Sequence, residues 1–193
     1  MTHAITGGIS PQYPPGQWKT GDVIAQSFFL RLPARVPEGR LHWQVNGVPV
    51  VELSVNGLSR SFVPPKLALR FDVAVGQSIK LVGANVRASD RRITIELAWQ
   101  ATSEMADSYR VFVHALDASG ALVAQSDGEP VNWTRPTSGW LAGEVVLDER
   151  VLTAPGPGEY TLWAGMVTES GDRLPAEGRP DGAIKLGVVT LAP

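Results

Sequence analysis

The sequence predicts an all-β protein, an antiparallel β-sandwich of the immunoglobulin-like or jelly-roll-like kind. Apolar and polar residues alternate with period two along several segments, as strands with one buried face require. Twenty glycines and fifteen prolines interrupt these segments at short intervals, which is typical of strands joined by turns. No segment of comparable length carries its apolar residues at helical spacing. These three observations together favour strands throughout.

The alternation is clearest in three segments, residues 40–46, 67–75 and 93–100. In the last of these, one face carries two isoleucines, a leucine and a tryptophan, and the other carries threonine, glutamate, alanine and glutamine. Each segment therefore has one face suited to a core. We expect Trp43 and Trp99, which lie on such faces, to be buried.

Turn residues separate the predicted strands. Asn-Gly pairs at 46–47 and 56–57 each follow a strand, and this dipeptide is the strongest short hairpin signal. The tetrapeptide Asp117–Gly120 lies between predicted strands at 109–116 and 121–126. It ends on glycine, where a positive φ would be needed. We therefore expect a hairpin at each of these three places.

A weak internal repeat predicts two domains. Residues 18–24 (WKTGDVI) read like residues 140–146 (WLAGEVV), and a strand ending in leucine and a proline-containing link follow both. We therefore expect a partial sandwich repeat of three to four strands at 1–75 and a complete β-sandwich domain at 76–193. A partial sandwich must cover its open face against the complete domain or against another chain.

Composition narrows the classes of function. The hydrophobic fraction of 44% and charged fraction of 19% are those of a folded globular protein. The net charge of −2 and the absence of any basic run beyond Arg91-Arg92 argue against a nucleic-acid partner and an anionic lipid surface. There is no cysteine, hence no disulfide or thiolate metal site. No apolar stretch approaches the ~18–20 residues of a membrane span, so we expect no direct membrane insertion.

The sequence carries no recognisable catalytic signature. Neither a G-x-S-x-G elbow, nor H-E-x-x-H, nor a glycine-rich phosphate loop is present. Glu144 and Asp148 share a strand face, yet the strand rise separates them by about 13 Å, too far for a glycosidase pair. His114 and Asp127 would suit a metal or acid/base pair, but a histidine that orients two strands is the simpler interpretation. A structural calcium through Asp127 and Glu129 stays open. We expect no catalytic residue, no metal and no cofactor.

Tryptophans supply the best functional clue. Trp133 and Trp140 flank the proline-containing loop 132–139, and exposed aromatic rings stack on the apolar faces of sugars. Trp140 is expected to plug the core, as its repeat counterpart Trp18 would. Trp133 suits core and binding surface equally, and Trp163 has an exposed position by alternation. The expected binding residues are Asn132, Trp133, Arg135, Trp163 and Asp127.

A run of spaced motifs resembles a known module. The motifs, in order, are YRVFVHALD at 109–117, AQSDGEP at 124–130, PTSGW at 136–140, GEVV at 143–146, GEY at 158–160 and RLP at 173–175. They resemble a recurrent bacterial β-sandwich module at the C-terminal, extracytoplasmic end of large membrane proteins similar to protein O-mannosyltransferases. The resemblance covers about residues 76–193. It implies a location outside the cytoplasm and an accessory role, not a reaction. The sequence departs from the pattern in lacking membrane spans.

These observations give three ranked hypotheses. The first is a non-catalytic, extracytoplasmic accessory or binding module whose candidate ligand is a carbohydrate. The second is a structural or protein–protein interaction module that packs on a membrane protein or on its own copy, as a homo-oligomer. The third is a glycan hydrolase.

Overall fold

The computed structural model describes residues 14–23, 34–36, 38–45 and 47–192. The chain divides into two compact units, residues 1–32 and 33–193. In the first, the described part is a short 3-10 turn, η1 (Pro15–Gln17), followed by a bend in which the Lys19 amide donates to Asp22 Oδ2 over 2.8 Å. Trp18 is exposed, so it does not plug a core as expected. The predicted strand that would end at Leu30 lies outside the described residues.

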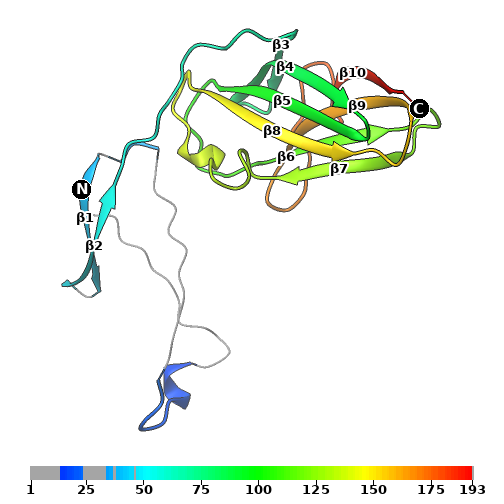
Figure 1. The fold of residues 1–193 in the computed structure, drawn as a ribbon. Coiled ribbons are helices and arrows are strands. Elements are labelled where there is room, and N and C mark those ends of the chain that lie inside the picture. Colours follow the sequence, from blue (N-terminus) through cyan, green and yellow to red (C-terminus); the bar gives the residue numbers. More distant parts are fainter. Residues whose placement is uncertain (1–13, 24–33, 37, 46, 193) are drawn as a thin grey trace. The chain divides into compact units, whose positions relative to one another are not determined.

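The second unit contains a β-sandwich of two four-stranded antiparallel sheets (Figure 1). The strands of one sheet, in spatial order, are β3 (Leu69–Val75), β4 (Ile79–Ser89), β5 (Arg92–Ala101) and β8 (Val145–Thr153). The strands of the other are β10 (Ile184–Leu191), β9 (Gly158–Val167), β6 (Arg110–Leu116) and β7 (Leu122–Gly128). The predicted fold class, an all-β antiparallel sandwich, is confirmed.

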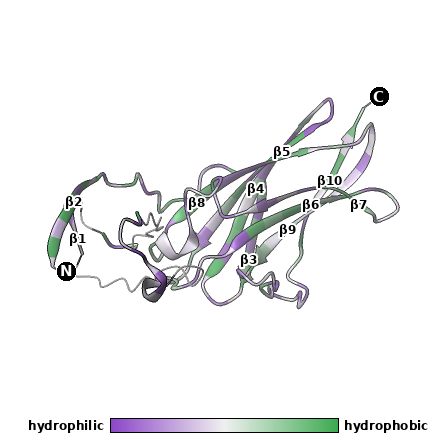
Figure 2. Cartoon of the chain, turned by 90° about the horizontal axis from the view of Figure 1, so that it is seen from below, coloured by the Kyte–Doolittle hydropathy of each residue, from purple (hydrophilic) through white to green (hydrophobic). Residues whose placement is uncertain are grey.

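The core lies between the two sheets. On β5 the alternation works as predicted, because Ile93, Ile95, Leu97 and Trp99 are all fully buried. Leucines, valines and alanines from the facing sheet complete the core, and Trp140 is fully buried within it, as expected. In Figure 2 the strands of both sheets carry hydrophobic stretches, as a core shared between two sheets requires.

The predicted boundary between residues 75 and 76 falls inside a strand pair. β3 hydrogen-bonds to β4 with Val75 opposite Ile79, so β3 belongs to the same sheet as β4 and β5. The segment Leu69–Val75, assigned by sequence to the partial repeat, is therefore an edge strand of the sandwich. Strands joined by a short link usually pair as neighbours in one sheet, and the link between β3 and β4 is only residues 76–78. β3 is therefore part of the sandwich and not of a separate repeat.

Before the sandwich, β1 (Gly39–Val45) and β2 (Val48–Val55) form the hairpin predicted at residues 46–47. Trp43 is half-buried on this two-stranded hairpin and does not belong to the sandwich core, contrary to expectation. Among the described residues, this hairpin is a sheet by itself, with no second sheet of its own to bury an apolar face. The second Asn-Gly pair, at 56–57, makes no hairpin, because residues 56–60 are irregular after β2 ends.

Two further elements complete the described chain. The hairpin predicted around Asp117–Gly120 joins β6 to β7, with Ala115 opposite Ala124. A short 3-10 turn, η2 (Thr137–Gly139), lies in the link from β7 to β8. Among the described residues, no helix is long and apolar enough to cross a membrane.

Candidate functional site

A pocket of about 330 Å³ lies on the outer side of the β10-β9-β6-β7 sheet. Three consecutive outward positions of β6 contribute Arg110, Phe112 and His114 to its lining. The remaining lining residues come from β7, β9 and two loops: Asp127, Gly128, Trp133, Val167, Gly171 and Arg173. The pocket therefore combines two aromatic rings, an imidazole, one carboxylate and two guanidinium groups, all from one half of the sandwich.

Strand register brings these side chains together. Phe112 pairs with Asp127 of β7 on one side and with Gly165 of β9 on the other. Arg110 pairs with Val167. Directly paired residues point to the same face of a sheet, so these side chains share the outer face while Val111 and Val113 fill the core.

Phe112 forms the floor of the pocket and is nearly fully buried. The Arg173 guanidinium stacks on its ring, 4.7 Å from the centroid. Gly165 leaves room for the ring, since an ideal Cβ at that position would lie 2.5 Å from two of the ring carbons and 2.3 Å from the Gly182 carbonyl oxygen. The absent side chain at Gly165 is therefore what allows the Phe112 ring to pack over this position.

Trp133 stands at the rim of the pocket on an unusual turn. Val131, Asn132 and Trp133 all have left-handed backbone, with φ of 54°, 50° and 67°. Such angles are uncommon without glycine and cost about 1–3 kcal/mol each, most for a β-branched residue. The turn holds the indole against Gly128, where a Cβ would lie 2.9 Å from Trp133 Nε1. The Trp133 side chain nevertheless stays 59% exposed.

A buried ion pair holds the start of this turn. Asp148 and Arg150 point inward from β8, and Arg150 Nε donates to Asp148 Oδ2 over 2.8 Å. Arg150 Nη2 also donates to the carbonyls of Gly128 and Glu129, and Asp148 Oδ1 accepts from the Val131 amide over 2.7 Å. Burial raises the pKa of Asp148, and Arg150 opposes that rise. The other bonds of the pair therefore end on the backbone that leads to Trp133.

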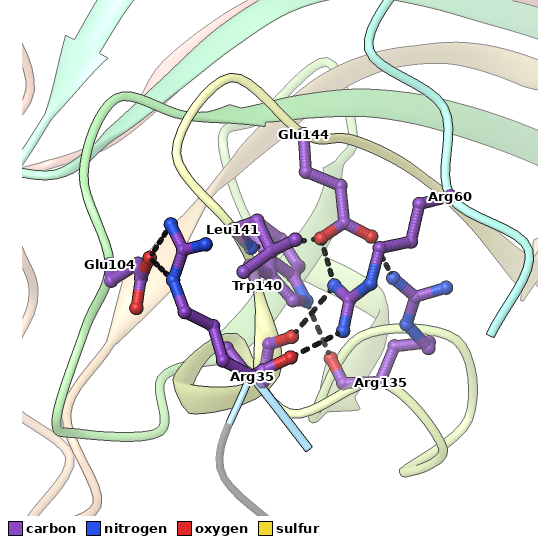
Figure 3. Close-up of polar contacts among 9 residues, drawn as sticks. Arg35, Arg60, Glu104, Arg135, Trp140, Leu141 and Glu144 are labelled. Carbon is purple, nitrogen blue, oxygen red and sulfur yellow. Dashed lines mark hydrogen bonds and ion pairs between the residues drawn. The ribbon is translucent and has the colours of Figure 1, made fainter. Parts of the chain in front are cut away.

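A second buried carboxylate holds the end of the turn (Figure 3). Glu144 is fully buried and forms ion pairs with both Arg60 and Arg135, and it accepts from the Leu141 amide over 2.9 Å. Trp140 Nε1 donates to the Arg135 carbonyl over 3.0 Å. The expected shared strand face of Glu144 and Asp148 is not formed, because β8 begins at Val145 and only Asp148 lies on it. The two carboxylates instead bind residues on either side of the strained turn.

His114 and Asp127 lie close enough to interact. Their Nε2 and Oδ1 atoms are 3.6 Å apart, longer than a hydrogen bond. Burial lowers the pKa of His114; Asp127 opposes this effect and Arg173 adds to it. The imidazole therefore favours its neutral form and can donate or accept a hydrogen bond at the pocket wall. No group of three or more potential metal-ligating side chains occurs in the part of the chain that the structure describes.

The structure brings together two of the five residues predicted to bind. Asp127 and Trp133 both line the pocket. Asn132 is exposed on the same turn without lining the pocket. Arg135 is bound to Glu144. Trp163 is half-buried opposite His114 on β9, with the Arg179 guanidinium 5.8 Å from its ring centre.

Among the pocket residues that sequence reasoning missed, three carry a charge or an aromatic ring: Arg110, Phe112 and Arg173. Arg110 and Phe112 alternate with buried valines on β6, so their outward direction was readable once the strand was recognised. The sequence did not show which of the two sheet faces would carry a pocket. Arg173 comes from the β9–β10 link, and only the fold of that link brings it over Phe112.

No protein-family model and no curated protein matches this chain, whereas several solved structures are similar to parts of it. The C-terminal domain of wzt is similar with a TM-score of 0.48 and 8% identity, covering 63% of this chain and 77% of that one. A β-glucuronidase from glycoside hydrolase family 2 is similar with a TM-score of 0.38 and 16% identity. That likeness covers 53% of this chain but only 10% of the β-glucuronidase.

Proposed function

We propose that this chain is a non-catalytic binding module that takes a carbohydrate in the pocket beneath Trp133. The observation that carries the proposal is the indole itself, an exposed ring held at the rim of a pocket by three residues of left-handed backbone. Strained backbone in residues other than glycine is concentrated at binding and active sites, and here it carries an exposed aromatic ring. Its support by two buried carboxylates indicates that its position matters.

The chemistry of the lining suits a sugar. Sugar rings have apolar faces, which stack on aromatic side chains, and hydroxyl groups, which need hydrogen-bond donors and acceptors. Trp133 offers the aromatic face. Asp127 accepts, His114 does either, and Arg110 donates. A pocket of about 330 Å³ is at the small end of the range for ligand sites, a size that suits one or two sugar residues.

The same lining supports a non-catalytic role. Hydrolysis of a glycosidic bond generally needs two carboxyl groups about 5–10 Å apart. Asp127 is the single carboxylate among the residues that line this pocket. Glu144 and Asp148 are both fully buried and bonded to arginines, so neither supplies the second group.

The proposal is tested by binding of a glycan array to the wild-type chain and to Trp133→Ala. Loss of the ring should weaken binding of any captured glycan at least tenfold, measured by calorimetry or affinity electrophoresis. Trp18→Ala, which removes an exposed tryptophan outside the pocket, is the matched control and should bind normally. Equal binding by Trp133→Ala and the wild-type chain would reject the pocket as the site.

A second candidate function rests on the β1–β2 hairpin. The register places Leu41 opposite Leu53 and Trp43 opposite Val51 on one face. Val51 and Leu53 are 49% and 44% exposed. A two-stranded ribbon with an exposed apolar face favours an interaction module that packs on a membrane protein or on its own copy. Analytical ultracentrifugation of the wild-type chain and Leu53→Lys tests whether the hairpin packs on a second copy of the chain. The wild-type chain should self-associate, and the variant should not.

The proposed location is outside the cytoplasm, as an accessory domain. It is supported by the motif resemblance at residues 109–175 to the extracytoplasmic end of membrane proteins similar to protein O-mannosyltransferases. Cell fractionation of the tagged natural protein tests it. Recovery in the cytosolic fraction alone would contradict it.

A further inference from the structure

The pocket carries more positive than negative charge. Arg110 and Arg173 both line it, against the single carboxylate of Asp127. Within the described residues, neither arginine lies within ion-pair distance of a carboxylate; the ion pairs of Arg35, Arg40, Arg60, Arg135 and Arg150 are all elsewhere. Two guanidinium groups without a carboxylate partner in one concavity make a site for an anion.

Both guanidinium groups are held in place but keep free donors. Arg110 Nη2 donates to the Glu169 carbonyl over 2.9 Å, and Arg110 Nε is buried without a hydrogen-bond partner among the described residues. Arg173 is held by stacking on Phe112 and by a long bond of 3.4 Å from Nη1 to the Asp181 carbonyl. A guanidinium group has five N–H donors, so most of those on Arg173 remain available to a ligand.

The positions of the two groups divide the pocket. Arg110 and Arg173 lie on the side of Val167, whose isolated bridge to Arg173 brings the β9–β10 link onto the sheet. Asp127 lies on the side of β7, next to Gly128 and Trp133. An anionic substituent is therefore favoured at the arginine side of the pocket.

We propose that the ligand is an acidic sugar, whose carboxylate binds Arg110 and Arg173 while its ring stacks on Trp133. The inference rests on the proposed carbohydrate function and adds the chemical class of the sugar. Arginine forks match the planar carboxylate geometry, and two of them give a bidentate or bridged arrangement. Asp127 repels a carboxylate at the opposite side, which sets the orientation of the ligand.

The test compares oligogalacturonides with the same oligosaccharides after chemical reduction of their carboxyl groups. The wild-type chain should bind the acidic form at least tenfold more tightly at low ionic strength. The preference should shrink with added salt, because screening weakens exposed charge interactions. This comparison needs no variant, so it stands even where a substitution disturbs the fold.

Variants assign the preference to the pocket. Arg173→Gln should remove most of the preference for the acidic form, measured as the ratio of the dissociation constants of the two forms for the same variant. Arg179→Gln, which also removes an arginine stacked on an aromatic ring but lies outside the pocket lining, should keep the preference. A preference equally strong in Arg173→Gln would overturn the assignment.

The remaining outcomes separate the two proposals. Equal binding of acidic and reduced forms, with both lost in Trp133→Ala, overturns the acidic-sugar inference and leaves the carbohydrate function standing. Tighter binding of a sulfated or phosphorylated sugar than of the carboxylate form overturns the carboxylate assignment. Absence of binding to every sugar on the array overturns both proposals.

Discussion

Arg150 Nε donates to Asp148 Oδ2 over 2.8 Å inside the sandwich, on a strand face otherwise filled by Val146 and Leu152. A buried ion pair is not by itself a source of stability, because desolvation of both charges offsets their attraction. The value of this pair lies in its other bonds, which end on the backbone of Gly128, Glu129 and Val131. The pair links the core to the turn that presents Trp133.

Removal of one partner of this pair should be costly. Asp148→Leu leaves Arg150 charged and buried without its carboxylate, and we expect the free energy of unfolding to fall by about 3–5 kcal/mol. The double variant Asp148→Leu/Arg150→Met removes both charges and should recover a large part of that loss. Urea denaturation of the wild-type chain, the single variant and the double variant measures these differences in the free energy of unfolding. A double variant no more stable than the single one would contradict this account.

The space above Gly165 should not tolerate a methyl group. In Gly165→Ala the new Cβ would meet the Phe112 ring and the Gly182 carbonyl, and we expect a loss of about 1–3 kcal/mol in the free energy of unfolding. The floor of the pocket should shift with Phe112. Gly156→Ala is the matched control, because a Cβ at that position would have nothing within 4 Å. Thermal denaturation of both variants would decide it, and equal melting temperatures would refute the packing argument.

The left-handed turn should respond to backbone freedom at Asn132. Asn132→Gly removes the cost of the positive φ and should raise the free energy of unfolding by up to about 1 kcal/mol, whereas Asn132→Ala should lower it. The Asn132 side chain is exposed, so little packing changes in either variant. Chemical denaturation gives the order of stability. If alanine proved as stable as glycine, the turn would not be left-handed in solution.

Acid should destabilise the fold through His114. Burial holds the pKa of this imidazole below its usual 6.5, so the unfolded chain binds a proton more readily than the folded one. The contribution of His114 to stability is therefore complete above pH 6.5 and is lost as the pH falls from there through the folded pKa. Asp127 moderates the effect, while Arg173 strengthens it.

His114→Gln isolates that contribution. The variant keeps a polar side chain that does not titrate, so its stability should fall less than that of the wild-type chain between about pH 7 and pH 5. Urea denaturation at both pH values measures the difference. Parallel losses in the two chains would show that another group dominates the acid response.

Strand positions could be predicted because each strand carries its own pattern. Ile93, Ile95, Leu97 and Trp99 alternate with polar residues, and local geometry alone sends them to one face. The same rule sends Arg110, Phe112 and His114 to one face of β6, although it did not show that this face carries a pocket. Trp43 shows where the rule ends, because alternation predicts a face but not what will cover it.

The pocket depended on contacts between segments distant in the sequence. Arg173 reaches Phe112 from a link far along the chain, and Trp133 reaches Gly128 through a left-handed backbone that valine and tryptophan rarely adopt. Arg135 was expected at a binding surface because it lies beside Trp133, yet Glu144 binds it. Trp133 and Arg135 are close in sequence, yet the ion pair with Glu144 gives Arg135 a different role. Such pairings form only when the chain has folded.

Period-two alternation and turn residues were therefore sufficient for an antiparallel β-sandwich, because each acts over a few residues. The assembly of Arg110, Phe112, His114, Asp127, Trp133 and Arg173 into one pocket needed the packed fold. The energies that place those side chains come from buried ion pairs and strand register, which join residues far apart in the chain.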